Sequence, residues 1–192
     1  MATHKQTELV RHQIIRATDE LLHQKGYNAM SFSDIAEASG VPRGNLNYHF
    51  KTKKAVLEAV IDFRIKQMKT MLEEWEAQLD TPLERLKRFA QIPVIEKKAV
   101  TKYGCPMGSL NTELGKKQED LQMISRQQFD LFREWLSRQF TLLAPLQNSD
   151  ELAVHLLVQT QGLVVLAHTY DDMQVIDTEV AHILSWLETI KN

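Results

Sequence analysis

The chain has 192 residues, of which 43% are hydrophobic and 25% charged, a composition typical of a globular protein that can bury a core. Its first residues lack the apolar segment of a signal peptide, and no stretch reaches the roughly 18 uninterrupted apolar residues of a membrane span. We therefore expect a cytoplasmic protein without membrane contact. The single cysteine, Cys105, excludes an internal disulfide and a cysteine-rich zinc site.

Charge is unevenly distributed along the chain, although the net charge is only -2. Residues 1–66 contain ten Lys and Arg against seven Asp and Glu, a net of +3. Residues 67–192 contain 13 against 18, a net of -5. This asymmetry favours an amino-terminal module that binds phosphates, joined to a larger body that does not.

The spacing of apolar residues predicts helices along almost the whole chain, so the expected fold class is all-α. A first helix ends near Lys25, where Gly26 can adopt a left-handed conformation. Its apolar face consists of Val10, Ile14, Ala17 and Leu21.

Two short helices joined by a tight turn are predicted next. Ser31 and Asp34 have the spacing of a capping box at the start of the first one, which stops at a glycine. Val41-Pro42 forms the turn, and residues 43–50 form the second short helix. This arrangement is typical of a helix-turn-helix, whose second helix enters the major groove of DNA.

The side chains around this turn suit DNA recognition. Arg43 can present a bidentate fork to guanine, and Asn45 and Asn47 can pair with adenine or donate to phosphate. Lys53, which opens the next helix, would add a phosphate contact. The candidate DNA-binding residues are Ser31, Ser33, Arg43, Gly44, Asn45, Asn47, Tyr48, His49 and Lys53.

The segment FSDIAEASGVPRGNLNYHFKTKKAVLEAV resembles the amino-terminal signature of the TetR family of transcriptional repressors, and the resemblance spans about residues 8–66. The turn, the recognition helix, a His-Phe pair and a lysine three positions later follow in the family's order. One position departs from it, because Asn47 stands where many members have a tyrosine and Tyr48 comes one position later. Either Tyr48 grips a phosphate or Asn47 reads a base. His49 is equally compatible with phosphate contact and with packing.

The resemblance implies a three-helix DNA-binding domain, here residues 1–52, followed by a ligand-binding and dimerising helical bundle, residues 53–192, with about nine helices. Because one short helix touches too few base pairs to be specific, we expect a homodimer on a pseudo-palindromic operator. The two carboxy-terminal helices have broad apolar faces and are the candidates for the dimer interface. A small-molecule effector bound between the helices of the body would change the separation of the two DNA-binding domains.

The body is predicted to consist of amphipathic helices interrupted by one tract rich in Gly and Pro. The helices are expected at residues 53–79, 82–92, 121–143, 150–170 and 177–190. The tract, KYGCPMGSLNTELGKK, occupies residues 102–117. Its glycines allow unusual backbone angles.

Cys105 lies in this tract, at an expected helix start where the helix dipole would favour a thiolate. The sequence GCPMGSLNTEL resembles a segment of a branch of TetR-like repressors, some of which sense electrophiles or oxidants through this cysteine. The alternative is that Cys105 is a small buried hydrophobe. The candidate effector or sensor residues are Cys105, Tyr103, Met107, Phe132, Trp135 and His168. The aromatic members could line an apolar cavity, but aromatic residues at helical spacing are usually core residues.

Two other classes of protein compete with the regulator. An enzyme would have to use Cys105 and one of seven histidines, and no local motif supports this, so we expect no catalysis, cofactor or metal site. A helical small-molecule-binding protein that has lost DNA affinity is disfavoured by Arg43, Tyr48 and Lys53. The sequence therefore favours a DNA-binding repressor that is released by a small apolar ligand, or by an electrophile or oxidant acting at Cys105.

Overall fold

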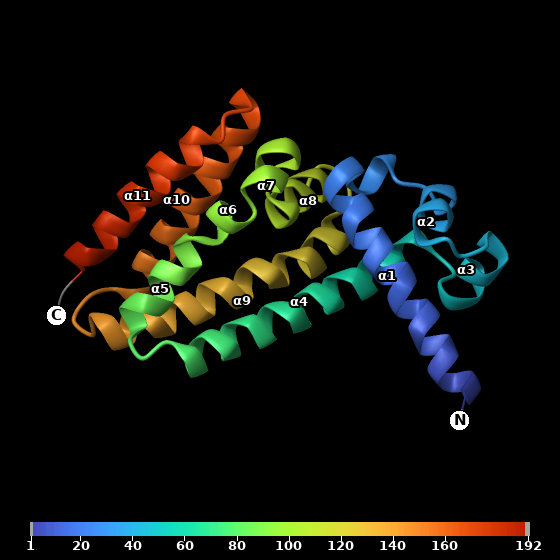
Figure 1. The fold of residues 1–192 in the computed structure, drawn as a ribbon, viewed down its shortest axis with the longest axis horizontal. Helices are drawn as coiled ribbons and strands as arrows, with labels where there is room; N and C mark the ends of the chain where they lie inside the picture. Colours follow the sequence, from blue (N-terminus) through green and yellow to red (C-terminus); the bar gives the residue numbers. More distant parts are fainter. Residues whose placement is uncertain (1, 191–192) are drawn as a thin grey trace. The chain divides into compact units, whose positions relative to one another are not determined.

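A computed structural model describes residues 2–190, and their regular structure is entirely helical (Figure 1). The predicted all-α fold class is confirmed. The helices are α1 (Ala2–Ala29), α2 (Phe32–Ser39), α3 (Arg43–His49), α4 (Lys53–Gln78), α5 (Pro82–Ala90), α6 (Ile92–Ile95), α7 (Lys97–Tyr103), α8 (Pro106–Leu114), α9 (Glu119–Leu143), α10 (Ser149–Tyr170) and α11 (Gln174–Thr189).

The described residues form eleven helical segments, more than the nine or so expected, because the tract before α9 is helical in short pieces. Pro93 and Pro106 lie within the first two residues of α6 and α8. An N–H group at these positions has no acceptor within the helix, so proline removes no helical hydrogen bond there. Gly104 ends α7 with a φ of 78°. The helix-breaking residues therefore divide this tract into short helices without abolishing them.

The chain divides into two compact units. Unit 1 contains the residues up to Gln67 together with Ser109–Arg126, and unit 2 contains Met68–Gly108 and the residues from Gln127 onward. Helices α4, α8 and α9 each contribute residues to both units. The sequence predicts a boundary after residue 52 between a DNA-binding domain and a ligand-binding, dimerising domain. This functional division stays a prediction.

Unit 1 has a hydrophobic core that fixes the two short helices on α1 and α4. Ile14 of α1, Ile35 of α2, Leu46 of α3 and Leu57 of α4 are completely buried. Gln13 of α1 also donates a hydrogen bond of 2.6 Å from Nε2 to the main-chain oxygen of Ser39, at the end of α2. Helix α3 thus shares one hydrophobic core with α1, α2 and α4.

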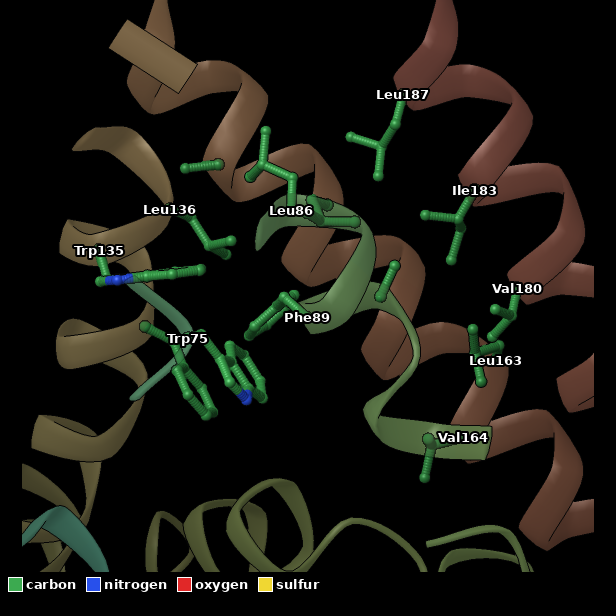
Figure 2. Close-up of a cluster of buried hydrophobic side chains, with 14 of the residues drawn as sticks. Trp75, Leu86, Phe89, Trp135, Leu136, Leu163, Val164, Val180, Ile183 and Leu187 are labelled. Carbon is green, nitrogen blue, oxygen red and sulfur yellow. The ribbon is translucent and has the colours of Figure 1, made fainter. Parts of the chain in front are cut away.

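Unit 2 has a separate core in which α5, α9, α10 and α11 meet (Figure 2). Phe89 and Phe132 pack edge to face with ring centroids 5.0 Å apart. Trp75 and Trp135 form a second such pair at 6.0 Å. Edge-to-face geometry is favoured for buried aromatic rings.

Helix α10 has an unusually apolar composition. Within the part of the chain that the structure describes, it is the helix whose length and composition would allow it to cross a membrane. The core helix of a soluble protein meets the same test, and one face of α10 is buried in the core of unit 2. Its opposite face is exposed and includes Val158, Val165 and Leu166.

Candidate nucleic-acid interface

Helix α2 begins with the predicted capping box. The main-chain nitrogen of Asp34 donates to Oγ of Ser31 at 3.2 Å, and the main-chain nitrogen of Ser31 donates to Oδ2 of Asp34 at 2.8 Å. Lys25 pairs with the other carboxylate oxygen at 2.8 Å. Gly40 closes the helix with a φ of 65°, a conformation that a side chain would disfavour. Both ends of α2 are therefore fixed by residues near them in sequence.

These contacts predict a pH dependence of stability. Hydrogen bonds from Lys25 and Ser31 hold the pKa of the Asp34 carboxyl well below its usual range. A carboxyl with a lowered folded-state pKa stabilises the fold above its unfolded pKa, about 3.9, and loses that contribution as pH falls through the folded value. The urea midpoint of wild type should therefore fall more steeply than that of Asp34→Asn between about pH 5 and 2.

The control for this measurement is Asp62→Asn, which replaces an exposed carboxylate of α4 in the same unit. Its pH profile should follow that of wild type. Equal slopes of urea midpoint against pH for wild type and Asp34→Asn would show that Lys25 and Ser31 do not stabilise the ionised carboxylate of Asp34.

Helix α3 has one buried and one exposed face. Leu46 is completely buried, and Val41 and Phe50, which flank the helix, are 4% and 3% exposed. The guanidinium of Arg11 lies 5.0 Å from the centre of the Phe50 ring. The exposed residues of α3 are Arg43, Gly44, Asn45, Asn47 and Tyr48.

The structure brings several of the predicted DNA-binding residues together. Nη1 of Arg43 lies 3.4 Å from Oγ of Ser33, a weak contact that a phosphate or base could replace. Tyr48 is 70% exposed, and its ring packs edge to face against His49 at 5.3 Å. A Cβ atom at Gly44 would meet no described atom within 4 Å. The surface of α3 is thus polar, open and rich in donors.

Ser31 and Lys53 already have partners in unit 1. The Ser31 hydroxyl bonds the Asp34 carboxylate at 2.6 Å. Nζ of Lys53 donates to the main-chain oxygens of Tyr27 at 2.8 Å and Met30 at 3.0 Å. Both side chains support the backbone leading into α2, and DNA contact by either stays a prediction.

Glu113, which lies in the Gly- and Pro-rich tract, is not among the residues predicted from the sequence. Its carboxylate accepts hydrogen bonds from the main-chain nitrogens of Tyr27 at 2.8 Å and Asn28 at 2.7 Å. The available signal was Gly26, because a break inside a helix leaves main-chain donors that need an acceptor. No short-range pattern identifies which acceptor is used.

Two of the predicted effector residues lie in the core of unit 2. Trp135 is 1% exposed and Phe132 is 5% exposed. Nε1 of Trp135 donates to Oε1 of Glu76 at 2.7 Å. Both side chains therefore pack as core residues, and a role for them in lining an effector site stays a prediction.

The remaining effector candidates surround the turn between α7 and α8. Cys105 is half-buried, and its Sγ accepts a hydrogen bond from the main-chain nitrogen of Gly108 at 3.4 Å. Cys105 and Met107 both pack against the unit 2 core. Lys102 lies 5.0 Å from the ring centre of Tyr103.

His168 is exposed, and its Nδ1 lies 2.9 Å from the main-chain oxygen of Thr101. This contact occupies one of the two ring nitrogens with the backbone of α7, and a role for His168 in sensing an effector stays a prediction. Among the described residues, no group of three or more His, Cys, Asp or Glu side chains could hold a metal ion.

A shallow apolar groove lies elsewhere on unit 2, between α6 and α11. Its volume is about 370 Å³. It is lined by Gln91, Val94, Ile95, Asp177, Val180, Ala181 and Leu184. None of the predicted effector residues belongs to this lining.

Comparison with known proteins identifies the family. The model for bacterial regulatory proteins of the tetR family matches residues 14–60, which carry the helix-turn-helix. An HTH-type transcriptional regulator in the lacX 3′ region of Lactococcus lactis subsp. lactis is 30% identical over 173 residues, 88% of each chain. The chain belongs to the TetR family. The protein is therefore a DNA-binding transcriptional regulator and not an enzyme.

Solved structures show that the TetR fold extends over nearly all of the chain. A TetR-family regulator from Agrobacterium tumefaciens superposes with a TM-score of 0.83 at 18% identity, covering 97% of this chain and all of that one. A TetR regulator from Legionella pneumophila gives 0.79 at 24% identity, covering 93% and 96%. At such low identities the likeness establishes the shared fold.

Proposed function

We propose that this TetR-family regulator is a cytoplasmic, homodimeric repressor that reads a pseudo-palindromic operator with α3 of each copy. The exposed face of α3 carries the proposal. It presents the guanidinium of Arg43 and the amides of Asn45 and Asn47, while Leu46 fixes the opposite face in the core. Arginine and asparagine are the side chains that pair bidentately with guanine and adenine in the major groove.

The exposed face of α10 supports dimerisation through the last two helices. Val158 is 62% exposed and Val165 is 59% exposed, and Gly162 lies between them on the same face. A Cβ atom at Gly162 would meet no described atom within 4 Å. Glycine inside a helix costs about 1 kcal/mol relative to alanine, so its presence there is best explained by the close approach of a partner helix. Helix α11 packs beside α10.

Val165→Glu should convert the dimer to a monomer and weaken operator binding by at least about tenfold. The substitution places a charge in a surface that the partner would desolvate, and each monomer then binds one half-site without the benefit of linkage. Light scattering coupled to gel filtration measures the mass, and fluorescence anisotropy measures the affinity.

The matched control is Leu146→Glu, which adds the same charge at a residue that is 90% exposed outside α10. This variant should remain dimeric. A dimeric Val165→Glu protein with normal operator affinity would contradict the proposed interface.

Two kinds of signal would release the repressor: a small apolar ligand held between the helices of the body, or an electrophile or oxidant acting at Cys105. The second is supported by the half-buried position of this thiol directly before α8. With a para-quinone, the thiol sulfur adds to a ring carbon and its proton is released. The electrons of the attacked C=C bond shift to a carbonyl oxygen, which takes up a proton. The hydrogen on the attacked ring carbon then moves as a proton to the second oxygen, so that the product is a hydroquinone thioether with the C–S bond intact. Displacement of α8 would follow from the bulk of the adduct.

Cys105→Ser should bind the operator like wild type and should no longer be released by a para-quinone. Serine is close to cysteine in size but lacks the nucleophilic thiolate. Anisotropy with and without the quinone measures release. Intact mass measures the adduct, which has one possible cysteine site because the chain has a single cysteine. Equal release of both proteins would remove the thiol mechanism and leave the non-covalent ligand.

A further inference from the structure

A break within α1 creates two main-chain donors near the DNA-binding helices. Gly26 has a φ of 75° and a ψ of 172°, which interrupts the helical hydrogen-bond ladder. The nitrogens of Tyr27 and Asn28 follow the break directly and thus resemble the free donors at the start of a helix. Tyr27 itself is 6% exposed.

Glu113 of α8 satisfies both donors with one carboxylate. Oε2 accepts from the nitrogen of Tyr27 at 2.8 Å, and Oε1 accepts from the nitrogen of Asn28 at 2.7 Å. A Cβ atom at Gly26 would lie 2.7 Å from Oε2. The glycine is therefore needed both for its backbone angle and for the close approach of the carboxylate.

The same segment is held by Lys53 through its carbonyl groups. Nζ donates to the oxygens of Tyr27 and Met30, and it lies 4.4 Å from the centre of the Tyr27 ring. The Glu113 carboxylate accepts hydrogen bonds from N–H groups of this segment, and the Lys53 ammonium donates to its C=O groups. Together the two side chains fix residues 27–30.

Residues 27–30 lead directly into Ser31, which caps α2. Helix α2 in turn supports α3, because Ile35 and Leu46 are both completely buried in the core of unit 1. Any change in the path of residues 27–30 would therefore alter the orientation of the helix that faces DNA.

We infer that Glu113 is a positioning residue for specific DNA binding, which it controls through the backbone of Tyr27 and Asn28 without touching DNA. Glu113 lies outside residues 14–60, the part of the chain matched by the family model, and 61 positions after the expected domain boundary at residue 52. The DNA-reading surface thus depends on a side chain from the segment Ser109–Arg126 of unit 1.

The test is Glu113→Gln, which keeps the size of the side chain but leaves one acceptor oxygen for two donors. An operator duplex is first selected from a random pool with the wild-type protein. Its affinity for Glu113→Gln should fall about tenfold, within the usual range of coupling between separate groups. Affinity for a scrambled duplex, which depends on overall charge, should stay within about twofold of wild type. Amide hydrogen exchange at Tyr27 and Asn28 should become faster.

Glu119→Gln is the control, because it removes the same charge from an exposed residue of unit 1. It should bind both duplexes like wild type. Glu113→Asp keeps the carboxylate with a shorter reach and should give an intermediate affinity, which also provides a second variant if Glu113→Gln folds poorly. Normal operator affinity in folded Glu113→Gln would overturn the inference, and so would a parallel loss of operator and scrambled-duplex binding in both Glu113 variants.

Discussion

Replacing Arg43 with alanine is expected to weaken binding to the operator by about 1–3 kcal/mol, which is about 5- to 150-fold. Arg43 is the first residue of α3 and is exposed, and its guanidinium makes a weak hydrogen bond with Ser33. The amino-terminal residues of a recognition helix are those that reach base edges. Two N–H donors of the guanidinium fit the O6 and N7 acceptors of guanine.

The measurement is anisotropy on the selected operator and on duplexes with single base changes. Arg138→Ala provides the control, since it removes one exposed arginine from unit 2 and should leave the affinity unchanged. If Arg43 reads a base, the variant should also discriminate less at one position of each half-site. Unchanged affinity and unchanged base preference would show that Arg43 makes no base contact.

Replacing Trp135 with alanine is expected to lower the free energy of unfolding by about 3–5 kcal/mol, as for other large buried aromatic residues. Trp135 is 1% exposed, packs edge to face on Trp75, and donates to Glu76 through its indole nitrogen (Figure 2). The truncation would leave a large cavity in unit 2 and remove one of two hydrogen bonds to Oε1 of Glu76, which also accepts from Gln139.

Urea unfolding followed by circular dichroism measures the change, because the signal does not depend on the indole that is removed. Leu142→Ala, at a residue that is 63% exposed, should change stability by less than about 0.5 kcal/mol. A loss of less than about 1 kcal/mol in Trp135→Ala would mean that the side chain fills little of the core.

The helix-turn-helix could be predicted in detail because its signals are local. The capping box joins Ser31 to Asp34, Gly40 ends α2, and Leu46 of α3 packs in the core. Each of these contacts is decided within a few residues, where propensity and hydrogen-bonding rules are strongest.

The remaining features depend on residues that are far apart in sequence. The donors of Tyr27 and Asn28 are 86 and 85 positions from Glu113. Lys53 fits either a phosphate or the main-chain oxygens that the structure assigns to it, and nothing in its own neighbourhood distinguishes the two. The sequence therefore does not show which of several possible distant groups a hydrogen-bond donor or acceptor will pair with.

Aromatic spacing likewise could not separate a core from a ligand cavity. Phe132 and Trp135 lie one helical turn apart, as either role requires, and only the surrounding side chains of α5 and α4 make them core residues. The Gly- and Pro-rich tract was expected to interrupt the helices of the body. It contains α8 all the same, because Pro106 stands at the first position of that helix, where proline is tolerated.

The central claim, that two copies of α3 read one operator, is tested most directly by titrating the wild-type protein into the labelled operator duplex at about 50 and 200 mM salt. We predict two protomers per duplex, an affinity that falls steeply with salt, and binding to a scrambled duplex that is weaker by about a thousandfold or more. Equal affinity for operator and scrambled duplexes, or saturation at one protomer per duplex, would contradict it.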